Sequence, residues 1–437
     1  MFSTIINRIK SSEIGMRIAT GAFWSFSGTA LAKFIVLVSG ILCAHVLSKE
    51  EYGQFGMVRT TISMFAVLGS GSLGLTASKY ISEFKNQKQH RISSIYNMAN
   101  CFAFILGLIV VSIILLFAPY LASENLHSPE LVDSLRIGAI LLFVTVLNGA
   151  QGGTLSGLES FKSIAVNTLF GSIAESILML VGAYYFGVFG AVLGYGSGYI
   201  VLYILNNIAI KRKFKDYNIK VVRYKIDKSD LPILYRFSLP AALCSLLVAP
   251  VIWITKSILV NNAGYAELAA YEVADQWRMI ILFVPSAVSQ IVLPILSSMS
   301  HGDNNKYWKV LRINLYLNAG VAFLISILVV ILGPFIMTLY GSDYSSDSNV
   351  LTVLAVSTIF SSIANVVGLA ISSKAKMWIG FGFNLVWGIM TITFTYIFIN
   401  MGYGAIGLAF AFCLAYIIHS SLQLIYLKSA EKKYIAE

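Results

Sequence analysis

The amino-acid sequence predicts an all-α membrane protein, in which twelve transmembrane helices form two six-helix lobes around a central cleft. The composition points to this class, because 57% of the 437 residues are hydrophobic and only 12% are charged, whereas about 25% of an average soluble domain is charged. The apolar residues also form continuous runs, such as 102–118 and 321–332. Continuous runs predict helices, because a transmembrane β-strand alternates apolar and polar residues. The same hydrophobicity excludes a disordered chain.

The apolar runs divide the chain into five parts. A short amphipathic segment at 1–19 lacks the features of a signal peptide and is expected to lead in from the cytoplasm. The first lobe is expected at 20–210, a basic cytoplasmic linker at 211–231, the second lobe at 232–427 and a cytoplasmic tail at 428–437. The twelve spans are predicted at 20–46, 53–77, 93–118, 135–157, 163–185, 189–210, 232–256, 268–296, 311–339, 349–372, 377–399 and 404–427.

The basic residues predict the orientation of these helices. Most of the 31 Lys and Arg residues fall in the terminal segments and in alternate loops, whereas the other loops contain only Lys49, Arg136 and Lys256. Cytoplasmic loops carry an excess of Lys and Arg, so both termini are expected in the cytoplasm. The net charge of +11 is explained by this bias, with contact to anionic lipid head groups, and does not predict nucleic-acid binding.

The two predicted lobes are related by a repeat. When the sequence is shifted by 217 positions, three Asn and three Gly residues of the first half meet Asn and Gly residues of the second half. Among them, Gly187 meets Gly404 and Gly190 meets Gly407. Each repeat contains six spans, so both enter the membrane in the same direction, as in transporters with parallel repeats. The repeat therefore predicts a transporter, and the alternative is a bundle duplicated for stability alone.

Four spans carry basic residues that are costly to place in lipid. Lys33 lies near the middle of the first span, Arg59 in the second, Arg236 near the start of the seventh and Arg278 in the eighth. A charge at the centre of a transmembrane helix costs about 3 kcal/mol on insertion scales, and such residues usually face a protein interior or an aqueous cavity. We expect these four side chains to bind an anionic substrate, because Lys and Arg pair strongly with phosphate. Arg236 is also close enough to the membrane surface to reach it.

Three acidic residues within the spans are candidates for binding a coupling ion, either H⁺ or Na⁺. They are Glu175 in the fifth span and Glu272 and Asp275 in the eighth. Alternatively, Asp275 and Arg278 can neutralise each other at a helical spacing of three, and Glu272 can pair with Arg59. No cofactor, metal site or catalytic residue is expected, because the four Cys and five His residues are scattered without ligand spacing.

Glycine and proline residues within the spans favour a structural interpretation. The glycine-rich stretch at 187–198 superficially resembles a phosphate-binding loop, but it begins a predicted helix and no strand precedes it. Small residues at every fourth position let helices pack closely, and the glycines at 149–157 are interpreted in the same way. Prolines in the seventh and eighth spans, including Pro285, allow these helices to bend.

With these features in place, the sequence resembles the polysaccharide-exporter branch of the MATE-like flippase (MOP) superfamily, the Wzx-type O-antigen or capsule repeat-unit flippases. The resemblance covers essentially the whole chain and rests on the order and spacing of several short motifs. These motifs are Leu47–Gly53 at the turn into the second span, Leu73–Glu83 at its end, Ser238–Pro240 in the seventh, Tyr271–Pro294 in the eighth, and Gly187–Ala191 and Gly404–Leu408 at the starts of the sixth and twelfth.

The resemblance implies a transporter of the bacterial cytoplasmic (inner) membrane and not an enzyme. It implies that oligosaccharide repeat units, linked through diphosphate to undecaprenol, move from the inner to the outer leaflet by ion-coupled alternating access. Lys33 and Arg59 then lie in a cation-lined lumen. The implied partners are the lipid-linked oligosaccharide, membrane lipids and other glycan-assembly proteins. A lipid II-type flippase and a multidrug or metabolite cation antiporter stay open as alternatives, whereas the short outer loops disfavour a membrane glycan polymerase.

Overall fold

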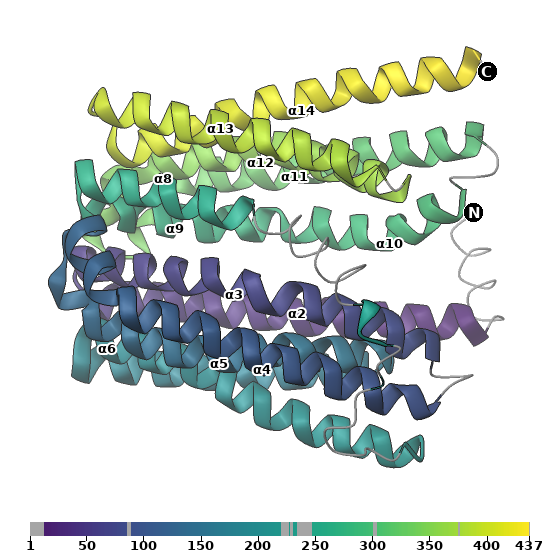
Figure 1. Ribbon diagram of the computed structural model, residues 1–437. Helices are drawn as coiled ribbons and strands as arrows, with labels where there is room; N and C mark the ends of the chain where they lie inside the picture. The colour runs from purple at the N-terminus through teal and green to yellow at the C-terminus, as the bar shows by residue number, and fades with distance from the viewer. Residues whose placement is uncertain are drawn as a thin grey trace. The chain divides into compact units, whose positions relative to one another are not determined.

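The computed structural model describes residues 13–84, 89–219, 227, 230–233, 247–299, 304–374 and 376–436. Within these ranges every regular element is a helix (Figure 1). By length and composition, seven helical segments are long and apolar enough to cross a membrane, and a bent pair within residues 49–84 makes an eighth. The chain is therefore a multi-pass, all-α membrane protein, as its composition predicts.

The chain forms two compact units, whose limits do not coincide with the midpoint of the sequence. Unit 1 comprises Met1–Ser39, Val58–Glu124 and Ser128–Leu246, and unit 2 comprises Gly40–Met57, Asn125–His127 and Leu247–Glu437. Two turns of the first half thus belong to the unit that is built mainly from the second half. As a consequence, the long helices α2 (Glu13–Val46) and α3 (Lys49–Phe84) each contribute residues to both units.

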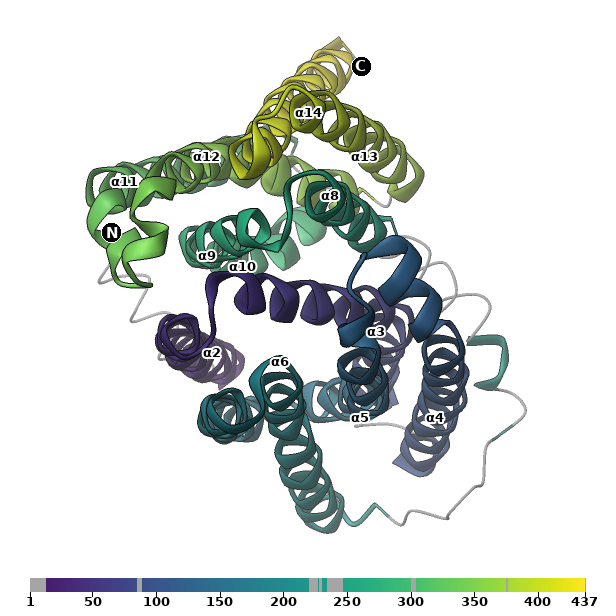
Figure 2. The same cartoon turned by 90° about the vertical axis from the view of Figure 1, so that its left-hand side faces the viewer.

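The other first-half elements follow in chain order. They are α4 (Gln89–Tyr120), the π-helix η1 (Leu121–Asn125), the 3₁₀-helix η2 (Pro129–Leu131), α5 (Val132–Gly157) and α6 (Phe161–Asp216). Helix α5 packs against both α4 and α6 (Figure 2). It also approaches α3 closely, since a Cβ atom on Gly153 would lie 2.1 Å from the carbonyl oxygen of Gly74.

The element α6 consists of two membrane helices joined by a tight turn. Its 56 residues would be far longer than the ~30 Å hydrocarbon core if they formed one straight helix. Gly187 interrupts it with φ 56° and ψ −138°, a left-handed conformation that favours glycine. Beyond the turn the two halves lie against each other, because a Cβ atom on Gly194 would lie 2.2 Å from the carbonyl oxygen of Leu178. The turn separates the predicted fifth and sixth spans, and these contacts confirm that the glycines serve helix packing.

The second-half elements also follow in chain order. They are α8 (Val248–Ala263), α9 (Tyr265–Ile281), α10 (Phe283–Met299), α11 (Asn304–Thr338), the 3₁₀-helix η5 (Ser342–Asp347), α12 (Ser348–Ser373), α13 (Met377–Asn400) and α14 (Gly404–Ala436). Helix α12 packs against α9, α10, α11 and α14, and α13 packs against α8 and α14 (Figure 2).

The helix order confirms the repeat. Shifted by 217 positions, α5 covers residues 349–374, where α12 spans Ser348–Ser373. Gly187 and Gly404, which the same shift superimposes, have φ angles of 56° and 49°. Both repeats thus use a left-handed glycine to begin their last helix.

Two details of the seventh and eighth spans differ from the sequence prediction. The expectation that the seventh span ends at residue 256, with Lys256 in the next loop, is wrong: α8 continues to Ala263, and Lys256 lies inside it with 4% of its surface exposed. The eighth span is divided into α9 and α10 at Leu282. Pro285 explains this break, because it has no N–H group to bond the carbonyl of Ile281.

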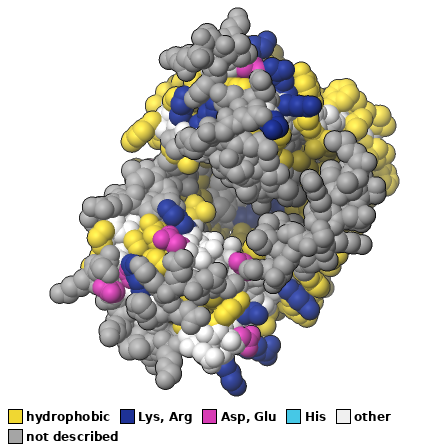
Figure 3. Space-filling model, turned by 90° about the vertical axis from the view of Figure 1, so that its right-hand side faces the viewer, with side chains coloured by type: hydrophobic (Ala, Val, Ile, Leu, Met, Phe, Trp, Pro, Cys, Tyr) yellow, Lys and Arg dark blue, Asp and Glu magenta, His cyan; other side chains and the backbone are white. Residues whose placement is uncertain are grey.

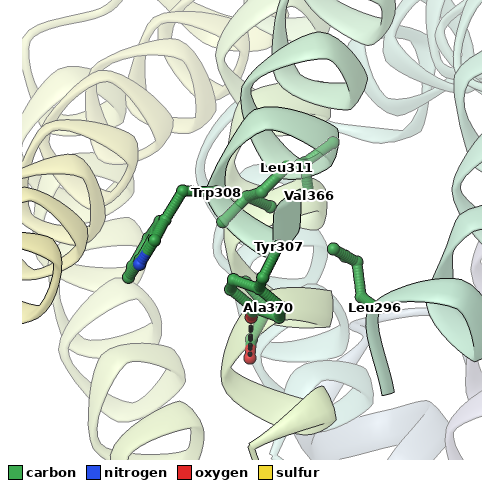
Figure 4. Packing of buried hydrophobic residues seen from close by; sticks show 6 residues of the cluster. All are labelled: Leu296, Tyr307, Trp308, Leu311, Val366 and Ala370. Atoms are coloured by element: carbon green, nitrogen blue, oxygen red, sulfur yellow. Dashed lines mark hydrogen bonds between the residues drawn. The ribbon is translucent and has the colours of Figure 1, made fainter. Parts of the chain in front are cut away.

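One end of unit 2 is held together by a buried cluster of α10, α11 and α12. Its members are Leu296, Tyr307, Trp308, Leu311, Val366 and Ala370 (Figure 4). The Lys374 ammonium group lies 4.6 Å from the centroid of the Tyr307 ring and 4.8 Å from that of Trp308. Burial, and to a smaller degree the neighbouring Lys376, holds the pKa of Lys374 below its ordinary value.

Exposed basic side chains occur at the ends of helices in both units. Lys211 and Arg212 lie near the end of α6, and Lys306 and Lys309 near the start of α11. Figure 3 shows Lys and Arg side chains exposed at the surface in several separate groups. This distribution is the one from which the sequence predicts a cytoplasmic side.

Candidate functional site

Unit 1 contains three of the predicted site residues. Lys33 lies on α2, Arg59 on α3 and Glu175 in the first half of α6, and all three side chains are half-buried. Arg59 and Glu175 are close enough for their charges to interact, although no ion pair within 4.0 Å joins Glu175 to a basic side chain among the described residues. Helix α2 also packs on α6, since a Cβ atom on Gly28 would lie 2.5 Å from the Cβ of Ala165.

Two tyrosines from the second half of α6 complete what we call the unit 1 cluster: Arg59, Glu175, Tyr195 and Tyr199. The two phenol oxygens are hydrogen-bonded at 3.0 Å, and both lie within electrostatic range of Glu175 and Arg59. The glycine packing within α6 brings them there, because a Cβ atom on Gly198 would lie 2.5 Å from the Cβ of Glu175. The cluster therefore combines a cation, a carboxyl group and two phenols from segments that are distant in the sequence.

Two of the ion pairs in unit 2 involve residues of α9, and we call them the unit 2 cluster: Lys256 with Glu272 and Asp275 with Arg278. Lys256 Nζ lies 2.6 Å from Glu272 Oε1, and these residues are only 4% and 2% exposed. Further along α9, Arg278 Nε lies 2.5 Å from Asp275 Oδ1. The guanidinium group of Arg278 also lies 5.9 Å from the centroid of the Phe412 ring on α14. Every charge of this cluster thus has an opposite charge in direct contact.

The hairpin of α8 and α9 explains why Lys256 meets Glu272. Gly264, with φ 88°, separates the two helices, and each of the paired residues lies eight positions from it. Residues at equal distances from a tight antiparallel turn lie opposite each other. A buried carboxylate such as Glu272 needs a partner of opposite charge, because a buried ion without one is strongly destabilising. The equal spacing of Lys256 and Glu272 from Gly264 was therefore the sequence signal that would have located Lys256 within a helix.

Gln276 lies between Asp275 and Arg278 in sequence and forms its own network. Its Nε2 donates a hydrogen bond to Tyr52 Oη at 2.5 Å, and its Oε1 accepts one from Tyr340 Oη at 3.3 Å. The 217-residue shift places Gln276 opposite Arg59. The position that carries a cation in unit 1 therefore carries a hydrogen-bonded neutral amide in unit 2.

The structure thus brings the predicted residues together in two separate groups. Arg59 and Glu175 share the unit 1 cluster, while Glu272 and Asp275 each contact a basic partner in unit 2. Lys33 lies on another helix of unit 1, and Arg236 falls outside the described residues. The phenols of Tyr195 and Tyr199 were not predicted, because 23 tyrosines occur in the sequence and none of them stands out by spacing.

The chain, whose apolar helices carry a few internal charges, is similar to known membrane proteins. Residues 18–300 match the family model described as polysaccharide biosynthesis protein, a stretch that covers more than half of the chain. The chain belongs to this family. The matched region extends from α2 through α10 and so includes all residues of both clusters.

Two curated relatives of this family member cover most of its length. It is 23% identical over 407 residues to the EPS I polysaccharide export inner membrane protein EpsE of Ralstonia solanacearum, with 89% of each chain covered. It is 24% identical over 428 residues to the lipopolysaccharide biosynthesis protein WzxC of Escherichia coli (strain K12), with 92% of this chain and 79% of that protein covered. These matches confirm the resemblance to polysaccharide exporters.

Solved structures show that this family member has the fold of MOP-superfamily transporters. A multidrug resistance MATE family transporter in an inward-facing conformation matches it with a TM-score of 0.80 at 16% identity, covering 92% of this chain and 96% of that one. A MOP superfamily transporter from Pyrococcus furiosus, described as having a binding pocket of reverse polarity, matches with a TM-score of 0.72 at 15% identity, covering 95% of each chain. The two-lobe, all-α fold predicted from the sequence is thus confirmed.

Proposed function

We propose that this protein moves undecaprenyl-diphosphate-linked oligosaccharide repeat units from the inner to the outer leaflet of the bacterial inner membrane, with both of its termini in the cytoplasm. The family and the two relatives are named for polysaccharide biosynthesis and export, and the fold is that of transporters. The single observation that carries the proposal is Arg59, a guanidinium group held among the membrane helices of unit 1. An arginine at this depth is costly in lipid and usually serves a substrate or ion path.

Arg59 and Lys33 are the strongest candidates for binding the diphosphate group. A guanidinium group can form two parallel hydrogen bonds to phosphate oxygens, which gives both strength and orientation. Arg278 stays a candidate, and it donates a hydrogen bond to Asp275 at 2.5 Å. Arg236 keeps its proposed role near the cytoplasmic surface, where the head group would first bind.

Glu175 is the strongest candidate for the coupling ion, H⁺ or Na⁺. Glu272 and Asp275 each contact a basic group at 2.6 Å or less, and such contacts favour the charged carboxylate without a further cation. Glu175 instead interacts with Arg59 at longer range. Because Arg59 and Glu175 share one electrostatic environment, anion binding at one and cation binding at the other are thermodynamically linked.

The proposal predicts a defined defect in cells that lack this protein or carry Arg59→Gln. Complete lipid-linked repeat units should accumulate in the cytoplasmic leaflet and surface polymer should be lost. Hydrogen bonds to charged groups contribute about 1.5–3 kcal/mol, so export should fall roughly 10- to 150-fold. Glutamine is a suitable replacement because it occupies the equivalent position 276 of the second repeat.

Lys309→Gln, at an exposed position on α11, is the matched control for loss of one positive charge and should restore surface polymer. Single repeat units accumulating in the outer leaflet would instead indicate a role in polymerisation. Unchanged lipid-linked sugars in the deletion strain would refute the proposal and direct attention to export of drugs or metabolites.

A further inference from the structure

One end of unit 2 brings together the start of α11, the end of α12, the start of α13 and the end of α14. The hydroxyl groups of Tyr307 on α11 and Ser373 on α12 are hydrogen-bonded at 3.0 Å. One turn further along α11, Arg312 contacts the carboxylate of Glu431 on α14. Side chains thus join α11 to both neighbouring helices, and the short connection between α12 and α13, residues 374–376, follows directly after Ser373.

The side chain of Lys374, in this connection, lies in an aromatic cradle. The rings of Tyr307 and Trp308 have their centroids 5.4 Å apart and are nearly perpendicular, at 88° (Figure 4). The Lys374 ammonium group lies 4.6 Å from the first centroid and 4.8 Å from the second. Because the face of an aromatic ring attracts a cation, the cradle holds this positive charge in a defined place.

Trp308 also carries a hydrogen-bond donor without an acceptor. Its side chain is only 6% exposed, and in the described part of the chain no atom accepts a hydrogen bond from its buried Nε1–H group. The hydroxyl group of the neighbouring Tyr307, by contrast, is bonded to Ser373. A buried donor without an acceptor is destabilising, and in native structures such a group often marks the place of a water or an ion. Since an ammonium group lies against the same indole ring, the missing acceptor is expected to be an anion.

The charge around the cradle is strongly positive. Residues 304–315, 370–378 and 424–431 contain six basic side chains and one acidic side chain. The basic residues are Lys306, Lys309, Arg312, Lys374, Lys376 and Lys428. The acidic residue, Glu431, is already in contact with Arg312. Burial, and then the neighbouring Lys376, lowers the pKa of Lys374, so the two ammonium groups are close enough to repel each other. A bound anion would relieve this repulsion.

The residues next to the cradle are those expected at the surface of a membrane. Helix α13 begins directly after Lys376, and its first two residues, Met377 and Trp378, are 52% and 82% exposed. Tryptophan at the end of a transmembrane helix typically lies at the level of the lipid head groups. Basic pockets between transmembrane helices bind the head groups of anionic lipids. Lysines beside exposed apolar side chains therefore match both the charged and the apolar part of such a lipid.

We infer that Trp308, Lys374 and Lys376 form a binding site for the head group of an anionic phospholipid. The two ammonium groups neutralise the phosphate, and the Trp308 N–H group donates a hydrogen bond to one of its oxygens. A lipid fits better than free phosphate, because Met377 and Trp378 offer apolar surface beside the charges. The site lies within unit 2 and shares no residue with the groups proposed to bind the exported glycan lipid or the coupling ion.

The test uses the full-length protein, purified in a neutral detergent and titrated with phosphatidylglycerol, while native mass spectrometry counts the bound lipids. The parent should retain phosphatidylglycerol more tightly than zwitterionic phosphatidylcholine. Trp308→Phe keeps an aromatic ring but removes the N–H group, and it should weaken retention roughly 10- to 150-fold, the range for a hydrogen bond to a charged group. Lys376→Gln, at an exposed position, should weaken retention roughly fivefold.

Trp387→Phe is the matched control for the loss of an indole N–H group. Trp387 lies on α13 in the same unit, is 3% exposed, and its Nε1–H group likewise has no acceptor among the described residues. It lies ten residues after Met377, about 15 Å along the helix from the lysines. Retention of phosphatidylglycerol should therefore stay at that of the parent.

Parental retention in both Trp308→Phe and Lys376→Gln would overturn the inference, as would equal retention of phosphatidylcholine by the parent. Displacement of the lipid by an equal concentration of inorganic phosphate would assign the site to free phosphate. Tighter retention of undecaprenyl diphosphate, lost in Trp308→Phe, would make the site part of the substrate path. Either result would also overturn it. The titration does not depend on export, whose failure appears instead as unchanged lipid-linked sugars in the deletion strain.

Discussion

The two clusters share one pair of equivalent helices, α3 and α9, but treat charge in opposite ways. The 217-residue shift replaces Arg59, Glu175, Tyr195 and Tyr199 of unit 1 by Gln276, Ile392, Phe412 and Tyr416 of unit 2. Only the last tyrosine is retained. Each of the four charges in the unit 2 cluster contacts an opposite charge within 2.6 Å, whereas the cation and carboxyl group of the unit 1 cluster interact at longer range.

The same repeat retains the two glycines that begin its last helix, so the halves differ in chemistry more than in backbone at this turn. Gly187 and Gly404 begin equivalent helices with similar φ angles, and α5 and α12 cover equivalent ranges. A duplicated scaffold can therefore supply one half with an adaptable polar site and the other with charges that neutralise each other. This difference predicts that substitutions in the unit 2 cluster affect mainly stability and those in the unit 1 cluster mainly transport.

The largest effect on stability is expected for Lys256→Ala. This change leaves Glu272 as a buried charge without its partner, which typically costs about 3–5 kcal/mol. The unfolding midpoint of the detergent-purified protein should fall accordingly, whereas Arg59→Gln should change it little. Combining Lys256→Met with Glu272→Leu should restore the midpoint, because replacing both partners by apolar residues is often neutral. A stable single variant would show that this pair does not hold the α8–α9 hairpin together.

A smaller effect is expected from Gly194→Ala in α6. The new Cβ atom would lie 2.2 Å from the carbonyl oxygen of Leu178, and such overpacking costs about 1–3 kcal/mol. The second repeat already has Ala411 at the equivalent position, so the effect should be specific to the tighter first-half hairpin. Gly152→Ala, which meets open space, should stabilise the protein by up to about 1 kcal/mol. Equal effects of the two changes on thermal unfolding would contradict the packing difference.

The smallest effect concerns a charge outside the spans, Lys374. Burial first, and Lys376 second, lowers its pKa from 10.5, so the unfolded chain binds more protons than the folded protein and stability rises with pH toward 10.5. Lys374→Met removes this dependence but also the contacts with Tyr307 and Trp308. The unfolding midpoint of the parent should therefore gain on that of the variant between pH 7 and 10. A difference that is constant with pH would show that only the ring contacts matter.

Unit 1 also has a basic residue near the end of a helix, Arg91, but this residue contacts the carboxylate of Asp230.

Local features of the sequence were sufficient to predict most of the fold. Continuous apolar runs predicted helices, and the glycine at 187 predicted the turn within α6, because both depend on neighbouring residues. The prediction that Lys256 lies in a loop was wrong, because it considered the charge of this residue alone. The burial of Lys256 depends on Glu272, which lies across the hairpin. The attachment of residues 40–57 to unit 2 depends on contacts with residues more than two hundred positions away, such as Gly53 with Tyr265, which no local pattern encodes. For the same reason, the sequence identified Arg59 and Glu175 as charged residues that are unusual in lipid. It did not predict that these two residues interact with each other.

Unit 2 cannot be completed from the second half of the chain alone. Gly53 packs on Tyr265 and Gly56 on Glu272. These glycines are synthesised roughly two hundred residues before the residues they contact. At about 5–20 residues per second, this separation is on the order of ten seconds or more before α9 leaves the ribosome. During that time the end of α2 and the start of α3 lack their final neighbours in unit 2. Pairing of helices at such a sequence separation is intrinsically slow. A fragment starting at α8 would carry the Lys256–Glu272 pair without its cover, so biogenesis of the second half depends on the prior insertion of the first two helices.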